Sequence, residues 1–163
     1  MAGERWISPV GRTLLVVGGI VLVAGLFLPW LSISGNSTEI PPGDYTGITA
    51  TELLNRLARG PWTWAAFAWL IVVVVIAFVS AGLGRSSSNF GTSGILILIL
   101  YVILVYVSIN LTNQDGTSGT AGFGLAYGFL VGLMGSALIE VGTRIAKPRP
   151  QLRVSSARGP TPP

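Results

Sequence analysis

The chain has 163 residues, of which 50% are hydrophobic and only 10% are charged, with ten Lys and Arg against six Asp and Glu. An average soluble domain is about 25% charged, so these charges are too few to cover a soluble globule. A wholly disordered chain is excluded, because disorder requires low hydrophobicity and high charge. The absence of Cys excludes a disulfide framework, and the absence of His removes the commonest metal ligand and neutral-pH general base. An integral membrane protein remains.

Four long apolar runs predict four membrane-spanning helices, because the length of each run is close to the ~20 residues that an α-helix needs to cross a bilayer core. The long alternation of polar and apolar residues that a membrane β-barrel requires is absent from the sequence. The expected fold is an all-α four-transmembrane-helix bundle, residues 1–145, with spans at about 12–31, 62–83, 94–111 and 121–143. The first run is expected to stay as a span, because it is longer than the apolar core of a signal peptide.

The distribution of basic residues predicts the orientation. If the N-terminus lies inside, eight of the ten Lys and Arg residues are inside, and only Arg56 and Arg59 are outside. Basic residues concentrate on the cytoplasmic side, so both termini are expected in the cytoplasm. The isoelectric point of about 10.1 then reflects topology, and no nucleic-acid partner is expected. Arg accounts for nine of the ten basic residues, and this usage, with abundant Gly, Ala, Val and Pro, favours a bacterial plasma membrane.

The outer loop, 32–61, is the largest segment expected outside the bilayer. Its first half is rich in Pro and Gly, which favour turns. Thr49 and Glu52 then fit a capping box, and leucines on one helical side follow them. The pattern predicts a short amphipathic helix over 50–59 that lies on the outer membrane face or caps the bundle.

Three tryptophans, Trp30, Trp62 and Trp64, stand at the two edges of this loop. Tryptophan is favoured at membrane interfaces, where its ring is apolar and its N–H stays hydrated. The favoured interpretation is an aromatic belt. The alternative is an aromatic site for a ligand or partner beneath the loop helix.

Small residues recur at helical spacing in two of the runs: Gly18 and Gly25 in the first, and Gly124, Gly128, Gly132 and Ser136 in the fourth. Such rows allow two helix backbones to approach closely within a membrane, and the seven-residue spacing suits a left-handed crossing. We expect the first and fourth spans to pack on each other. The alternative is that one of these faces docks another protein.

Glu140 is the only acidic residue that adjoins a span, and Arg144 follows it at the spacing of a helical ion pair. The rise of the helix places Glu140 about 27 Å along the fourth run, near the inner interface. An interfacial ion pair is the favoured interpretation. A proton relay is the alternative, because carboxylates deep in a membrane are commonly functional.

The remaining segment, 146–163, is basic and rich in Pro, and it is expected to be a disordered cytoplasmic tail. No catalytic residue, cofactor site or metal site is expected, because no motif for nucleophilic or metal chemistry is present.

The expected function is that of a non-catalytic accessory or scaffold subunit of a larger membrane assembly for transport, respiration or the envelope. Its expected partners are the lipid bilayer and other membrane subunits, or further copies of the chain. The alternative is a small oligomeric transporter or channel.

Overall fold

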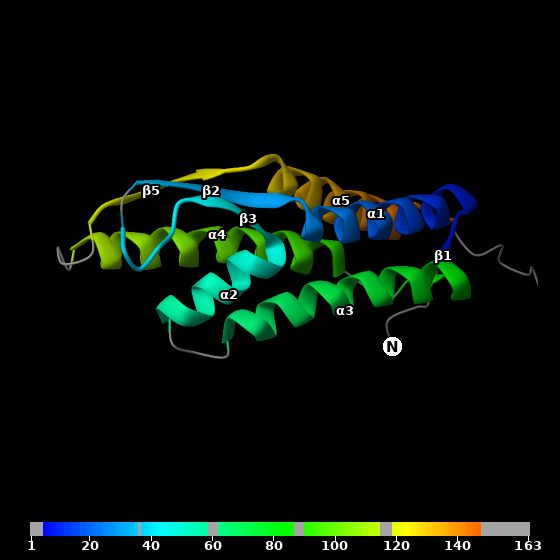
Figure 1. Cartoon of the computed structure of the whole chain (residues 1–163). Helices are drawn as coiled ribbons and strands as arrows, with labels where there is room; N and C mark the ends of the chain where they lie inside the picture. Colours follow the sequence, from blue (N-terminus) through cyan, green and yellow to red (C-terminus); the bar gives the residue numbers. More distant parts are fainter. Residues whose placement is uncertain (1–4, 36, 59–61, 87–89, 115–118, 148–163) are drawn as a thin grey trace, which may run out of the picture.

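The computed structural model describes residues 5–35, 37–58, 62–86, 90–114 and 119–147. Most of them are helical, in five helices: α1 (Pro9–Phe27), α2 (Gly47–Ala58), α3 (Trp62–Leu83), α4 (Phe90–Gln114) and α5 (Tyr127–Arg144). The long helices run side by side, and the shorter α2 lies near the N-terminal end of α3 (Figure 1).

Three of these helices are long and apolar enough to cross a membrane, namely α1, α3 from Thr63 onward, and α4. The fourth long helix, α5, has 18 residues and carries Glu140 and Arg144 near its end, which makes it less apolar. A membrane location is compatible with this architecture.

The fold is mostly helical, as expected, but it is not all-α, because the described residues also form six short strands. One antiparallel sheet has the order β4-β1-β6, formed by β1 (Arg5–Ile7), β4 (Arg85–Ser86) and β6 (Ala146–Lys147). The other has the order β3-β2-β5, formed by β2 (Pro29–Gly35), β3 (Gly43–Thr46) and β5 (Ala121–Leu125). All of them except β2 have five residues or fewer, which is too short for a clear alternation, and most of the strands pair with segments far away in the sequence.

The two sheets lie at opposite ends of the bundle (Figure 1). The β1 end, defined by β4-β1-β6, joins the segment before α1, the connection after α3 and the segment after α5. The α2 end, defined by α2 with β3-β2-β5, holds the two other connections. Because Trp6 pairs with Lys147, the first and last described residues lie at the same end.

Several helix boundaries differ from the predicted spans. The Ser8 hydroxyl accepts the Gly11 N–H at 3.1 Å, so α1 begins at Pro9 instead of residue 12. It ends at Phe27, because the chain turns into β2. The helix α4 extends the predicted 94–111 at both ends, whereas α3 occupies 62–83 as predicted.

The predicted start of the fourth span was wrong. Residues 121–125 form β5 beside β2, and α5 begins only at Tyr127. The segment contains Gly122 and Gly124. Glycine weakens a helix, and here the backbone gains strand hydrogen bonds instead.

The short loop helix exists, but its predicted start was also wrong. It begins at Gly47, directly after β3. The Thr46 hydroxyl accepts the Thr49 N–H at 3.3 Å, so the capping side chain is three residues earlier than expected. Glu52 pairs with Arg56 at 2.6 Å and takes no part in a capping box with Thr49.

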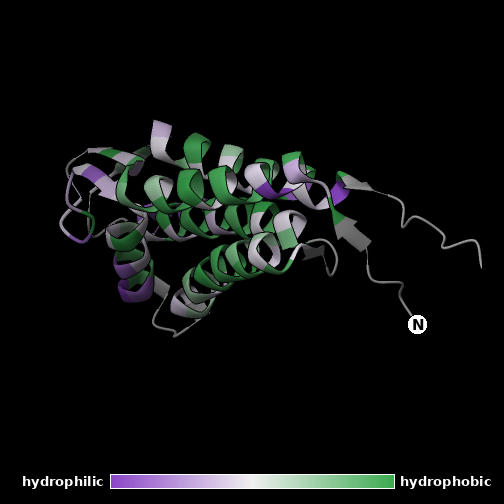
Figure 2. Ribbon diagram, turned by 90° about the vertical axis from the view of Figure 1, so that its right-hand side faces the viewer, coloured by the Kyte–Doolittle hydropathy of each residue, from purple (hydrophilic) through white to green (hydrophobic). Residues whose placement is uncertain are grey.

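The hydrophobic core lies between the long helices and continues beneath the sheet at the α2 end. Leu15, Leu22 and Leu98 are fully buried in its helical part. Many large apolar side chains instead face outward from α1, α3 and α4. Figure 2 shows apolar residues dominating the long helices, with hydrophilic ones gathered toward the ends. This distribution is typical of helices that face lipid.

Candidate functional site

The helices α1 and α5 pack antiparallel with their backbones almost in contact. A Cβ atom added at Gly18 would lie 2.8 Å from the Gly135 carbonyl oxygen, and one added at Gly135 would lie 2.5 Å from the Leu22 nitrogen. One added at Gly25 would lie 2.8 Å from the Gly132 nitrogen. Real Cβ contacts essentially never fall under 3.0 Å, so these three positions have room only for glycine.

The glycines of this interface follow a seven-residue spacing on both helices. Gly11, Gly18 and Gly25 of α1 lie against a second such row on α5, formed by Gly128, Gly135 and Gly142. Sequence reasoning singled out a four-residue row on the fourth run and missed Gly135 and Gly142. The matching seven-residue repeat was the signal that could have found them.

Two residues of the predicted row lie elsewhere. Gly124 is in β5, and a Cβ atom there would meet nothing within 4 Å, so this glycine takes no part in the helix interface. Ser136 is fully buried and faces α4, where its hydroxyl would lie 2.9 Å from a Cβ atom added at Gly94. The small-residue face of α5 therefore serves both α1 and α4.

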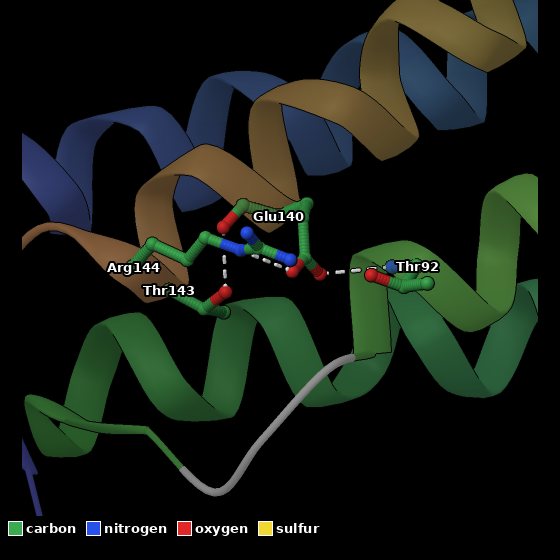
Figure 3. Close-up of polar contacts among 4 residues, drawn as sticks. All are labelled: Thr92, Glu140, Thr143 and Arg144. Atoms are coloured by element: carbon green, nitrogen blue, oxygen red, sulfur yellow. Dashed lines mark hydrogen bonds and ion pairs between the residues drawn. The ribbon is translucent and has the colours of Figure 1, made fainter.

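Glu140 joins α5 to the beginning of α4 (Figure 3). One carboxylate oxygen, Oε1, lies 2.6 Å from Nε of Arg144, and the other, Oε2, accepts the backbone N–H of Thr92 at 2.9 Å. Glu140 is only 8% exposed, although the Arg144 side chain is largely exposed. Both carboxylate oxygens therefore have partners within the protein.

The position of Glu140 suits the first turn of α4 electrostatically. The first N–H groups of a helix have no partner inside the helix, and the positive end of its dipole favours an anion. Gly91 allows this contact, because a Cβ atom there would collide with the backbone of Glu140. Sequence reasoning named the pair with Arg144 but missed Thr92 and Gly91, since only tertiary packing brings α4 to this point.

Trp30 lies inside the protein and not at a lipid boundary, where an aromatic belt would place it. It is 1% exposed, and its indole N–H donates to the Gly25 carbonyl at 2.6 Å. Its ring packs edge-on against Tyr101 and Phe129, with centroids 5.3 and 6.3 Å away. Trp30 is the second residue of β2, and its ring is enclosed by Tyr101 of α4, Phe129 of α5 and the start of α2 at Gly47.

The other two tryptophans lie on α3. Trp64 is 41% exposed and packs edge-on against Phe67, with the ring centroids 6.1 Å apart. Trp62 is the first residue of α3, and its side chain lies outside the described part of the structure. The structure therefore does not bring Trp30 and Trp64 together into one aromatic site.

A buried polar chain connects α4 to α2. The Tyr101 hydroxyl donates to Oγ1 of Thr51 at 3.1 Å, and the Thr51 hydroxyl donates to the Gly47 carbonyl at 2.7 Å. Both side chains are buried. Sequence reasoning missed this connection, which fixes α2 over the bundle.

The described residues contain no group of three His, Cys, Asp or Glu side chains that could hold a metal ion. Comparison of the chain with protein-family models, curated proteins and solved structures gave no match. The features that bear on function are therefore the glycine interface between α1 and α5, the contacts of Glu140 with α4 and Arg144, and the α2 end.

Proposed function

We propose that the protein is a non-catalytic accessory or scaffold subunit of a larger assembly in a bacterial plasma membrane. The observation that carries this proposal is the α1–α5 interface, where the backbones approach too closely for a side chain at Gly18, Gly25 and Gly135. Both carboxylate oxygens of Glu140 are engaged within the protein, Oε2 by the Thr92 N–H at the beginning of α4 and Oε1 by Arg144 on its own helix. In a bundle packed in this way, the outer surfaces are the part left to carry the function.

We propose four spans, with α5 as the fourth. Its 18 residues correspond to about 27 Å of helix, close to the hydrocarbon thickness of about 30 Å. This helix also packs along α1 over the whole stretch from Gly11 to Gly25. Glu140 and Arg144 fall in its last turns, from which long side chains reach the headgroup region.

The β1 end is the cytoplasmic side in this proposal, and both termini belong there. Eight of the ten basic residues belong to the segments that lead into or out of this end. The α2 end then faces outward, with the sheet β3-β2-β5 and α2 forming a structured cap. The basic tail that follows residue 147 lies outside the described residues, and we propose a cytoplasmic location for it.

The outward face of α4 is the surface best suited to a membrane partner. It presents a continuous set of exposed aliphatic side chains, namely Leu96, Ile99, Leu100, Ile103, Leu104 and Val107. Only 28% of its most apolar window is buried, against 39% for α1 and for α3. A long face of this kind suits side-by-side packing with another membrane helix.

The test is purification of the tagged chain from its host in a mild detergent, followed by mass spectrometry of the proteins that remain bound. We expect unrelated membrane subunits in fixed proportion to the chain. A pure homo-oligomer that carries solutes across liposome membranes would overturn this proposal in favour of the oligomeric transporter or channel.

A pair of matched variants locates the partner surface. Leu100→Trp with Leu104→Trp enlarges the outward face of α4 and leaves its apolar character intact. Val75→Trp with Val79→Trp does the same on α3, where both side chains are about as exposed. Loss of the bound subunits in the α4 variant alone assigns the interface to α4, and loss in neither variant contradicts that assignment.

A further inference from the structure

A groove opens between α1 and α3 near the β1 end of the bundle. Its volume is about 490 Å³, and its apolar floor is formed by Val16, Val17, Phe78, Ala81 and Gly82. Gly82 keeps it open, because a Cβ atom there would meet nothing within 4 Å. The groove is therefore a short, open apolar depression on the outer face of two helices that are apolar enough to cross a membrane.

Arg12 and Thr13 line the groove at its end nearest β1. Arg12 is exposed, and its guanidinium lies over Gly84, where a Cβ atom would collide with it. Gly84 has a φ of +67°, a conformation that also favours glycine. The chain thus leaves room for this guanidinium beside the groove.

Arg12 lacks a counter-charge within the described part of the chain. The ion pairs found there join Arg56 to Glu52 and Arg144 to Glu140. The first turn of α1 contains no acidic residue, although the helix dipole places positive charge there. A guanidinium and the positive end of a helix therefore meet at one end of an apolar groove, and an anion there would be stabilised by both.

We propose that this groove binds an anionic phospholipid from the leaflet at the β1 end. The phosphate accepts hydrogen bonds from the Arg12 guanidinium, and one acyl chain lies along Val16, Val17 and Phe78. A free phosphate would leave the apolar floor uncovered, and a zwitterionic lipid would bring its own positive charge close to Arg12. The site requires the chain to lie in a membrane, but it is independent of the accessory role proposed above.

The test is native mass spectrometry of the full-length protein released from micelles that contain dioleoylphosphatidylglycerol or dioleoylphosphatidylcholine. We expect phosphatidylglycerol to be retained about ten-fold better, as one charge-assisted hydrogen-bonded contact suggests. Arg12→Gln should abolish this preference, and Arg12→Lys should restore part of it. Arg144→Gln removes a charge at the same end but outside the groove, and it should keep the preference.

A second variant tests the groove without changing charge. Gly82→Phe places a ring in open space, so we expect normal folding, measured as an unchanged thermal midpoint in detergent, and weaker retention of phosphatidylglycerol. Glycerol phosphate, which has the headgroup charge without acyl chains, should not displace the lipid. The proposal is overturned if Arg12→Gln and Gly82→Phe both bind phosphatidylglycerol as the wild type does, or if glycerol phosphate competes fully.

Discussion

The carboxylate of Glu140, near the end of α5, accepts the backbone N–H of Thr92 in the first turn of α4, 48 residues earlier in the sequence. The same carboxylate pairs with Arg144 one turn later on its own helix. One side chain thus satisfies a free amide at a helix terminus and fixes the position of α4 against α5. The finding makes Glu140 a joint between helices.

Substitution of Glu140 tests this joint. Glu140→Ala leaves the Thr92 N–H without its partner, so we expect the free energy of unfolding to fall by about 1–3 kcal/mol. Glu140→Gln keeps an oxygen that can accept this hydrogen bond, and it should cost clearly less. The measurement is equilibrium unfolding in mixed micelles of dodecyl maltoside and SDS. Equal losses for Ala and Gln would show that the negative charge matters and the cap does not.

The glycine interface predicts that the same substitution, Gly to Ala, has very different effects on stability at two positions. Gly135→Ala introduces a methyl group 2.5 Å from the Leu22 nitrogen, so we expect a loss of about 1–3 kcal/mol as the helices separate. Gly82→Ala is the control, since it adds the same group to α3 in open space. There the better helix propensity of alanine should leave stability unchanged or raise it by up to about 1 kcal/mol. Similar unfolding curves for both variants would contradict the close packing of α1 on α5.

The burial of Trp30 predicts that its indole N–H contributes to stability. Trp30→Phe removes the hydrogen bond to the Gly25 carbonyl and leaves a space between Tyr101 and Phe129. We expect thermal unfolding in detergent to show a loss of about 1–3 kcal/mol. Trp64→Phe, at an exposed ring, should change stability by less than about 0.5 kcal/mol. A larger effect at Trp64 than at Trp30 would support the interfacial role expected from the sequence.

The contact between Tyr101 and Thr51 predicts energetic coupling between α4 and α2. Tyr101→Phe and Thr51→Val each remove one hydroxyl with little change in shape. In a double-mutant cycle we expect a coupling energy of about 0.5–1.5 kcal/mol, the usual net value of one hydrogen bond. If the stability losses of the two single variants add up to the loss of the double variant, the two hydroxyl groups act independently and α2 is held by apolar packing.

The long helices could be predicted from sequence because their signal is local. A run such as 62–83 is apolar throughout, and the helix α3 occupies those residues. The pair of Glu140 with Arg144 is also local, since residues four apart on a helix are neighbours. Such features depend only on the order of residues within one segment.

The strands could not be predicted in this way. Leu31 of β2 lies opposite Leu125 of β5, and Trp6 of β1 lies opposite Lys147 of β6. Apart from β3, which pairs with the nearby β2, each strand has a partner remote in the sequence, and only β2 is long enough to show a period of two. For this reason the local pattern predicts a helix at the glycine-rich start of the fourth apolar run, where the structure has β5.

By themselves, the shortage of charge and the long apolar runs indicated that the chain is compatible with a membrane and that helices dominate its fold, because a bilayer requires backbone hydrogen bonds within each segment. Only the tertiary structure decided which glycines meet, that Glu140 caps α4, that the Trp30 ring packs against Tyr101 and Phe129, and that Arg12 stands at the end of a groove. Each of these depends on the distance between residues that are remote in the chain, and the packing of helix on helix sets those distances.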